Sequence, residues 1–275
     1  MFFDFVRRRK IKLLLGSVTN KMKISIITVS YNSVDTLEDT IRSVLKQNYD
    51  DIEYIIVDGN SSDNTLELIK KYEKKFKDSS KSYKWISETD NGIYDALNKG
   101  IKLANGDIIG FLNSDDYYSD EEVVSDINIG FQENDIDCLY GNLKYIDSDN
   151  DKVVRDWQSR EFEKGLFEKS WSPAHPTFYC KKSIYDKFGN YKTDYKIAAD
   201  VELMYRFLEK HEIKSKFLDR YMVIMRQGGV STSGLKSTYI ITKEVRRAIL
   251  ENNGNFNIFK YLFYKMLKLK EFIKR

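Results

Sequence analysis

The amino-acid sequence predicts an α/β fold in which helices flank a Rossmann-like, mostly parallel central sheet. Apolar runs of strand length alternate with segments whose apolar residues recur at helical spacing across residues 24–112. The order over these roughly 90 residues is strand, helix, strand, helix, strand, helix, strand, which is typical of a doubly wound sheet. A chain of 275 residues with 41% hydrophobic content can bury a core of that size.

Each predicted strand is a short apolar run that stops at polar turn residues. The four strands are expected at residues 24–29, 54–57, 83–87 and 108–112. The helices that join them are expected at residues 34–45, 66–72 and 93–104, with Ser33 or Asp35 as the cap of the first. A further strand-like run at residues 221–225 precedes a glycine-rich segment.

Polar residues follow all four strands at their carboxyl ends. They are Tyr31, Asn32, Asp58, Asp90, Asp115 and Asp116. Ligands of doubly wound sheets bind outside the carboxyl ends of the strands, so we expect these side chains to gather at one rim. Carboxylates that lie together repel one another, and this arrangement suits Mg²⁺ or Mn²⁺, which take oxygen ligands and commonly bridge substrate phosphates. Taken alone, Asp115 and Asp116 are more typical of a turn or a helix cap than of a metal site.

Several other classes of protein lack support in the sequence. There is no GxGxxG after the first strand and no GxxxxGK[ST], which disfavours a dinucleotide oxidoreductase and a P-loop enzyme. A sugar-nucleotide pyrophosphorylase needs a glycine-rich, basic loop after the first strand, and residues 30–34 have neither feature. Cys138 and Cys180 form no CxxC pair and leave no zinc-ligand spacing, which fits a reducing compartment.

Charge is distributed unevenly along the chain. Residues 1–23 contain seven basic residues and one acidic residue, and residues 258–275 contain six and one, so the part between them is acidic. Basic ends indicate attraction to anionic surfaces. The acidic body and the lack of a recognisable reading module argue against a nucleic-acid partner. No apolar run approaches the roughly 20 residues of a membrane span, and no signal peptide is evident, so we expect a cytoplasmic protein.

The C-terminal segment has the pattern of an amphipathic helix. One face would carry Phe259, Leu262, Phe263, Met266, Leu269 and Ile273, with lysines on the remainder. Such a helix is typical of a membrane interface, where each basic residue near an anionic leaflet adds roughly 1 kcal/mol. The alternative is that the apolar stripe packs back on the domain. The first interpretation predicts peripheral association with an anionic surface at the inner face of the cell membrane.

Four segments resemble a known family in their order and spacing. They are TVSYN at residues 28–32, VDGNSSD at 57–63, DNGIYDALNKG at 90–100 and FLNSDD at 111–116. This set is similar to the family 2 glycosyltransferases with a GT-A fold, especially the short bacterial enzymes of colanic acid, capsule or exopolysaccharide assembly. The resemblance covers roughly residues 22–235, and the ordered set is far more specific than any single motif.

The resemblance implies roles for the residues at the rim. Tyr31 and Asp58 would hold the base of a nucleotide-sugar donor, and the loop from Asp90 to Gly92 would line the same pocket. Asp115 and Asp116 match the DxD region, in which one carboxylate meets the ribose and the other reaches a Mn²⁺ or Mg²⁺ ion on the diphosphate. The first Asp of the full motif is replaced by Asn113, which leaves open which carboxylate holds the metal.

Later segments match the acceptor side of the family. Asp200 stands at the position of the catalytic base, with helix capping as the structural alternative. His175, Trp171 and Glu202 are expected near the acceptor, although a structural histidine and a packed tryptophan are equally consistent with the sequence. The glycine-rich residues 226–234 are typical of a lid that brings Arg226 toward the diphosphate, or of a plain linker.

The predicted organisation has three parts: a basic arm at residues 1–21, a glycosyltransferase domain at 22–235 and C-terminal helices at 236–275. Within the domain, residues 22–118 would bind the nucleotide and residues 119–235 the acceptor. The resemblance implies inverting transfer of a sugar from a nucleotide-sugar donor, expected to be a UDP-sugar, to a hydroxyl of a lipid-linked or saccharide acceptor in cell-surface polysaccharide or O-antigen synthesis. The alternative is a non-catalytic, nucleotide-sugar-binding partner subunit of a glycosyltransferase complex, which the presence of Asp200, Asp115 and Asp116 disfavours.

Overall fold

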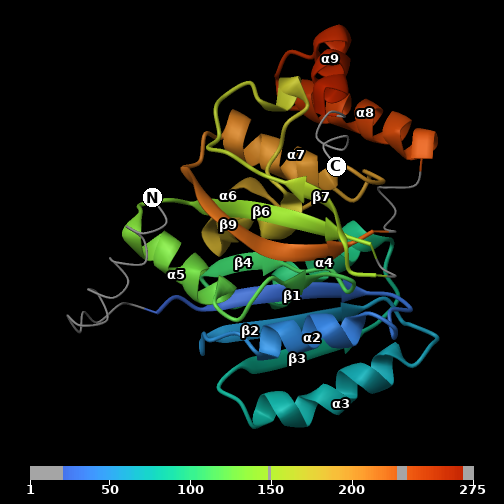
Figure 1. Ribbon diagram of the computed structural model, residues 1–275, viewed down its shortest axis with the longest axis vertical. Coiled ribbons are helices and arrows are strands. Elements are labelled where there is room, and N and C mark those ends of the chain that lie inside the picture. Colours follow the sequence, from blue (N-terminus) through green and yellow to red (C-terminus); the bar gives the residue numbers. More distant parts are fainter. Residues whose placement is uncertain (1–20, 148–149, 228–233, 269–275) are drawn as a thin grey trace.

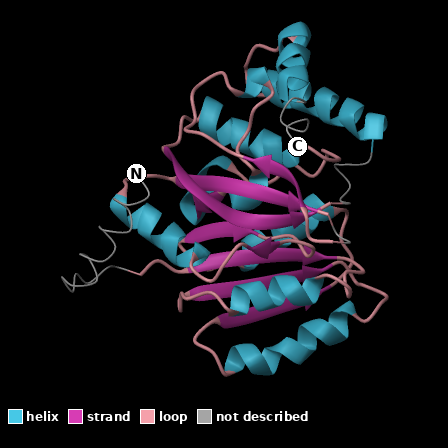
Figure 2. Cartoon of the chain, in the orientation of Figure 1, coloured by secondary structure: helices cyan, strands magenta, loops and turns pink. Residues whose placement is uncertain are grey.

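A curled sheet forms the centre of the molecule, and helices lie on both of its faces (Figures 1 and 2). The computed structural model describes residues 21–147, 150–227 and 234–268. The predicted basic arm therefore lies outside the described residues except for Lys21. None of the helices in these ranges combines the length and the hydropathy that crossing a membrane requires.

The first half of the chain builds four parallel strands in the order β3-β2-β1-β4. The strands are β1 (Ile24–Ser30), β2 (Ile52–Asp58), β3 (Ser82–Ser87) and β4 (Ile108–Phe111). The helices between them are α2 (Leu37–Leu45), α3 (Thr65–Lys77) and α4 (Ile93–Leu103). The predicted alternation of strands and helices is confirmed, with boundaries shifted by a few residues.

The second half extends this sheet beyond β4 with mixed strand directions, in the order β4-β8-β6-β9-β5 and with β7 paired to β6. The strands are β5 (Tyr117–Tyr118), β6 (Cys138–Ile146), β7 (Val153–Trp157), β8 (Tyr179–Lys181) and β9 (Ser215–Arg226). The helices are α5 (Val123–Glu133), η1 (Phe167–Lys169), η2 (His175–Thr177), α6 (Lys182–Phe188), α7 (Ala199–Tyr205), its π-helical continuation η3 (Arg206–Lys210), α8 (Gly234–Glu251) and α9 (Ile258–Lys268). The first half of the sheet is thus parallel throughout, whereas the second half combines the parallel pair of β6 and β9 with antiparallel pairs.

Two hydrophobic cores lie on opposite faces of the sheet because successive strand side chains point to opposite sides. In β1, Ile27 and Val29 belong to the core that also contains residues of α4, α7 and α8. Ile24 and Ile26 belong to the core that contains residues of α2, α3 and α5. All seven residues of β1 are buried, as expected for a strand covered on both faces.

Strand β1 is the point at which the sheet changes its direction of growth: β2 and β3 follow on one side of it, and β4 lies on the other side. Such a switch point is where doubly wound sheets bind ligands, in the crevice outside the carboxyl ends of the strands. The loop after β1 begins at Tyr31 and the loop after β4 contains Asp115 and Asp116. The sheet therefore places two of the predicted motifs beside each other.

A buried carboxylate secures the opposite end of these strands. Glu53 accepts hydrogen bonds from the Ser25 hydroxyl at 2.6 Å and from the Asn105 backbone and side-chain nitrogens at 2.7 and 3.1 Å. The Lys84 ammonium lies 2.5 Å from the same carboxylate. Burial works to raise the pKa of Glu53, but Lys84, Ser25 and Asn105 outweigh it and lower the pKa to about 2.

We expect Glu53→Gln to destabilise the fold by about 2–3 kcal/mol, because a pKa below the unfolded value of 4.5 means that the ionised form stabilises the folded state. This contribution is present above pH 4.5 and is lost as the pH falls toward 2. Urea denaturation at pH 7 and at pH 3.5 would measure it. The difference between wild type and variant should shrink at the lower pH, whereas Glu67→Gln on the exposed face of α3 should change little at either pH.

Candidate active site

Asp58 is the central polar residue beneath the predicted donor loops. It is fully buried and its carboxylate accepts four hydrogen bonds: from the hydroxyls of Ser30, Ser61 and Ser87 and from the Ser61 backbone nitrogen. Ser30, Asp58 and Ser87 are also paired in register at the carboxyl ends of β1, β2 and β3. All four acceptor positions of the carboxylate are therefore occupied by this chain.

An aromatic ring and a second carboxylate lie above this cluster. A Cβ atom on Gly59 would lie 2.6 Å from Asp90 Oδ2 and 3.4 Å from the Tyr31 ring, so the missing side chain of Gly59 lets both approach the backbone. Tyr31 is 65% exposed, so its ring is accessible from solvent. Asp90 Oδ1 accepts a hydrogen bond from the backbone nitrogen of Gly92, whose φ of 108° favours glycine.

Residues 113–116 form a tight turn directly after β4. The Asp116 backbone nitrogen donates to the Asn113 carbonyl at 3.1 Å, and the Asn113 side-chain amide donates to Asp116 Oδ2 at 2.9 Å. Thr40 of α2 donates its hydroxyl to the Asp116 carbonyl at 2.7 Å. The hydroxyls of Ser114 and Ser33 lie 3.0 Å apart and join this turn to the loop after β1.

The two carboxylates of this turn are poorly stabilised within the protein alone. Asp116 is fully buried, and its Oδ1 atom has no hydrogen-bond partner among the described residues. Burial, followed by the charge of Asp115, raises the pKa of Asp116 well above its usual value. Burial also raises the pKa of Asp115, against the charges of Arg226 and His175. A buried carboxylate with an unused oxygen is the arrangement that a cation would stabilise.

The residues present fit a divalent cation that is shared with a substrate. Among the described residues no group of three or more His, Cys, Asp or Glu side chains is placed to enclose a metal ion. Mg²⁺ is commonly held by only one or two carboxylates together with substrate phosphates and water, and Asp115 with Asp116 supplies that number. The replacement of the first motif Asp by Asn113 is compatible with this set, since the Asn113 amide occupies Asp116 Oδ2 and leaves Oδ1.

Arg226, the last residue of β9, lies against the same turn. Its guanidinium donates to the Asp115 carbonyl at 3.2 Å, pairs with Asp39 at 2.6 Å and lies over the Tyr117 ring. Arg226 and Asp39 also line a cavity of about 490 Å³ between α2 and β5, which none of the other predicted site residues lines. The predicted lid at residues 226–234 lies mostly outside the described residues.

Asp200, in the first turn of α7, lies beside His175 of η2. The His175 Nδ1 and Asp200 Oδ2 atoms are 3.2 Å apart, and the side chains are 35% and 20% exposed. His175 also acts electrostatically on Asp115, which joins the acceptor half to the turn after β4. The structure thus brings Asp200, His175 and Asp115 to one side of the rim.

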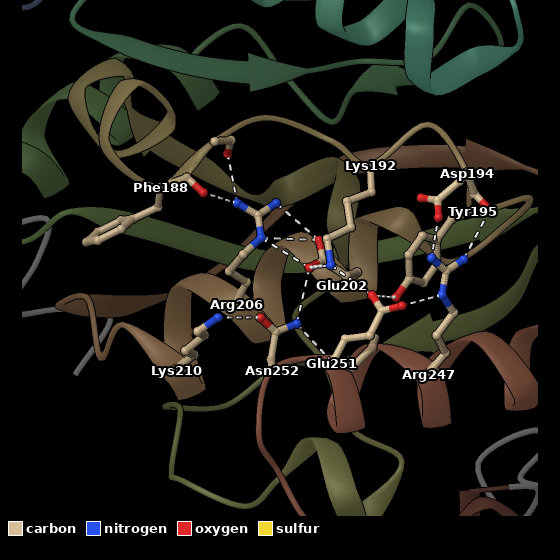
Figure 3. Close-up of polar contacts among 12 residues, drawn as sticks. Phe188, Lys192, Asp194, Tyr195, Glu202, Arg206, Lys210, Arg247, Glu251 and Asn252 are labelled. Atoms are coloured by element: carbon tan, nitrogen blue, oxygen red, sulfur yellow. Dashed lines mark hydrogen bonds and ion pairs between the residues drawn. The ribbon is translucent and has the colours of Figure 1, made fainter.

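Glu202 and Trp171 do not lie at an open surface. Glu202 is fully buried and contacts Arg206, Lys192 and Asn252, with Lys192 Nζ and Asn252 Nδ2 at 3.0 and 3.1 Å (Figure 3). Trp171 is 8% exposed and packs among aromatic rings that include Tyr140 and Phe167. These placements favour structural roles for both residues over the acceptor contacts predicted from the sequence.

Two residues that position Asp200 had no predicted role. Glu244 of α8 accepts hydrogen bonds from the backbone nitrogens of Lys196, Ile197 and Ala198, immediately before α7. The Tyr94 hydroxyl accepts one from the Ala199 backbone nitrogen at 3.2 Å. Tyr94 belongs to the third quoted motif, which offers a signal, whereas no local pattern connects Glu244 to residues more than 45 positions away.

Comparison with protein families matches this chain to one model. The description of that family is glycosyl transferase family 2, and the match extends over residues 25–196. An uncharacterized glycosyltransferase of Mycobacterium tuberculosis is 33% identical over 193 residues, which is 69% of this chain and 70% of the relative. A PGL/p-HBAD biosynthesis glycosyltransferase of Mycobacterium bovis is 25% identical over 226 residues, covering 80% and 81% of the two chains.

Solved structures show the same fold at low sequence identity. Residues 1–349 of S. aureus TarS in complex with UDP-GlcNAc superpose with a TM-score of 0.60 at 19% identity, over 92% of this chain and 72% of that chain. The mannosyltransferase PcManGT from Pyrobaculum calidifontis, in complex with GDP-Man and Mn²⁺, superposes with a TM-score of 0.63 at 14% identity. That alignment covers 95% of this chain and 76% of the mannosyltransferase.

We expect Gly59→Ala to weaken the predicted binding of UDP about tenfold, or about 1.4 kcal/mol, because the new Cβ displaces the Asp90 carboxylate. The thermal midpoint should change little, since the displaced atom is the end of a flexible side chain. Isothermal titration calorimetry with UDP would measure the loss. In an Asp90→Ala background the same substitution should cost nothing further, and independent, additive losses would contradict this explanation.

We expect Asp116→Asn to stabilise the metal-free protein by about 1 kcal/mol and to raise its thermal midpoint by roughly 2–4 °C. Because the folded-state pKa of Asp116 is raised, the cost of its charge appears as the pH rises through that pKa. The gain should therefore be larger at pH 8 than at pH 5. Differential scanning calorimetry would measure it.

Asp186→Asn, at an exposed carboxylate on α6, serves as the control for this substitution. A lower midpoint for Asp116→Asn than for wild type would show that the fold itself needs the charged carboxylate. We expect Mn²⁺ to raise the midpoint of the wild type, and this shift should be absent from Asp116→Asn and present in Asp186→Asn.

Proposed function

This chain belongs to glycosyl transferase family 2 and has the GT-A fold, and we propose that it transfers a sugar from a UDP-linked donor to an acceptor hydroxyl with inversion. The proposal rests on one observation: two carboxylates at one rim, Asp200 and Asp116, have different environments. Asp200 is partly exposed and held beside His175, whereas Asp116 is buried with an unused oxygen. The first arrangement suits a base, and the second suits a cation on a diphosphate.

Asp200 acts as the general base in this proposal. In an inverting transfer the acceptor hydroxyl attacks the anomeric carbon from the face opposite the leaving nucleotide and must lose its proton as the new bond forms. The partly exposed Asp200 carboxylate is able to take that proton. His175 keeps Oδ2 of the carboxylate in place, and Glu244 with Tyr94 fixes the backbone that enters α7.

The turn after β4 receives the diphosphate. Asp115 and Asp116 would hold Mn²⁺ or Mg²⁺, which would neutralise the charge of the departing nucleotide diphosphate. PcManGT, whose structure contains GDP-Man and Mn²⁺, supports a divalent ion in this fold. Arg226 already lies at the Asp115 carbonyl, and release from Asp39 would free its guanidinium for the phosphates.

The Tyr31 ring, Asp90 and Gly92 form the proposed seat for the base of the donor. Gly59 allows the ring and the carboxylate to converge, and the exposed ring offers a stacking surface. Asp58 supports this seat from below by ordering the loops after β1, β2 and β3. A direct contact between Asp58 and the base requires one of its serine partners to turn away.

The acceptor in this proposal is a saccharide or lipid-linked hydroxyl used in cell-surface polysaccharide synthesis. A relative that is 25% identical to this chain is a glycosyltransferase of PGL/p-HBAD biosynthesis, which supports a biosynthetic role. Because lipid-linked acceptors are presented at a membrane, we propose that the enzyme acts at the inner face of the cell membrane. The donor sugar and the linkage depend on the shape of the pocket.

The second candidate is a subunit that binds a nucleotide sugar without transferring it. It would need the donor seat and the carboxylates after β4 but not an exposed base. The placement of Asp200 beside His175, with part of its surface accessible, favours the enzyme.

We expect Asp200→Asn to lower kcat by roughly 10²- to 10⁴-fold while the Kd for the donor stays within about twofold of the wild-type value. The amide keeps the shape of the carboxylate but does not accept the proton. Nucleotide release from a panel of UDP- and GDP-sugars with Mn²⁺, with and without membrane extract as acceptor, would identify the donor and measure kcat. Calorimetry would measure donor binding.

Asp135→Asn is the matched control, because that carboxylate is 85% exposed and contacts only the surface residue Lys214 in the described structure. An unchanged rate in Asp200→Asn would favour the non-catalytic subunit. No release from any donor, together with normal nucleotide binding by Asp115→Ala, would refute the enzyme assignment.

A further inference from the structure

Helix α9 turns its apolar half away from the protein. Six of its large apolar side chains are exposed: Ile258, Phe259, Leu262, Phe263, Met266 and Leu267. At about 100° per residue they lie within an arc of roughly 180°. Phe259, Met266 and Phe263 are 82%, 61% and 54% exposed. The apolar stripe predicted from the sequence is therefore on the outer surface as far as residue 268, and Leu269 with Ile273 lies outside the described residues.

The other half of α9 is tied to the body of the protein. Tyr261 is 4% exposed and packs near the Phe256 ring. Lys260 donates to Glu168 of η1 at 2.9 Å, and Lys265 donates to the Thr242 hydroxyl of α8 at 3.1 Å. These contacts fix the rotation of the helix about its axis. The outward direction of the apolar half is thus set by its inner neighbours.

This orientation reverses the usual one for a surface helix, whose apolar stripe faces the core. Soluble monomers rarely expose a contiguous apolar patch of this kind unless it binds a partner or a membrane. Helix α9 lies at the end of the molecule beyond α7 and α8, opposite α3 (Figure 1). Its outer half is therefore accessible to a large, flat surface.

The charges around the patch identify the kind of surface. Helix α9 carries Lys260, Lys265 and Lys268 and no acidic residue, and Lys260 is paired with Glu168 of η1. On α8, Lys243 and Arg246 are exposed, whereas the two acidic residues of that helix, Glu244 and Glu251, are engaged with backbone nitrogens and basic side chains. A second copy of this chain would place lysines opposite lysines, so the complementary partner is anionic.

Lysines border the apolar arc on both sides. On a helical projection Lys260 follows Leu267 at one edge and Lys265 precedes Ile258 at the other. This is the order of side chains in a helix that lies in a membrane interface, where apolar side chains enter the acyl boundary and lysines at the edges lie at the level of the headgroups. Lys260 and Lys265 occupy these edges while they remain in contact with Glu168 and Thr242. The sequence beyond residue 268 adds Lys270, Lys274 and Arg275 against Glu271.

We propose that the outer half of α9 is the surface by which this protein docks on an anionic lipid bilayer. The inference rests on the proposed function for its purpose, since a lipid-linked acceptor is presented at such a surface. Phe259, Phe263 and Met266 are the side chains that insert into the bilayer. Through α8, whose Glu244 holds the backbone before Asp200, the docked helix is connected to the acceptor side of the site.

Vesicle co-sedimentation of the full-length protein tests the proposal. Wild-type protein should bind phosphatidylglycerol-containing vesicles, bind pure phosphatidylcholine vesicles at least about tenfold more weakly and lose affinity in high salt. The double variant Phe259→Glu with Phe263→Glu should lose about tenfold or more of the affinity for anionic vesicles. Val153→Glu, at an exposed apolar residue of β7, is the matched control and should bind as the wild type does.

The assay contains no donor or acceptor, so its outcome is separate from that of the proposed activity. A catalytically inactive protein that binds vesicles would refute only the proposed function. An active protein that does not bind vesicles would refute only the docking surface. Thermal midpoints of the variants establish that they fold. Unchanged vesicle binding by the double variant would overturn the proposal. So would light scattering that shows a dimer for the wild type and a monomer for the double variant.

Discussion

The burial of the Asp58 carboxylate is the constraint on which the donor side of the site depends. A charge with no exposed surface is tolerated only when hydrogen bonds replace its lost hydration, and here all of them come from three serines. Those serines lie at the ends of β1 and β3 and in the loop after β2. Because the carboxylate must be satisfied, the three strand ends are held in one register and the loops leave the sheet in defined directions.

The loop after β4 differs, because its buried carboxylate is not fully satisfied by hydrogen bonds from the described residues. Its buried Asp116 keeps one oxygen without a partner, although Asn113, Thr40 and Ser114 satisfy the groups around it. An unsatisfied buried carboxylate lowers stability, and natural proteins retain such groups mainly where a ligand supplies the missing interaction. The contrast between Asp58 and Asp116, two buried carboxylates, separates the residue that organises the rim from the residue that we propose binds a cation.

The acceptor side is held together by contacts between distant parts of the chain. Helix α7 presents Asp200 outward while Glu202, two residues later, points into a polar network with Arg206, Lys192 and Asn252 (Figure 3). Glu244 of α8 fixes the entry to the same helix. The C-terminal helices therefore serve both ends of the proposed reaction: they set the direction of the base, and α9 carries the surface that would meet the membrane.

The sequence by itself determined the alternation of β1 to β4 with their helices, the polar residues at the strand ends and the family, because these follow from local periodicity and short motifs. The tertiary structure alone decided which of those residues are accessible. Glu202, two residues after Asp200, was predicted to lie near the acceptor, yet it is buried and accepts a hydrogen bond from Asn252, 50 positions away. The amphipathic pattern of α9 was readable, but helical spacing says nothing about which half faces the body. That choice depended on Glu168 and Thr242, which hold two lysines of the polar half.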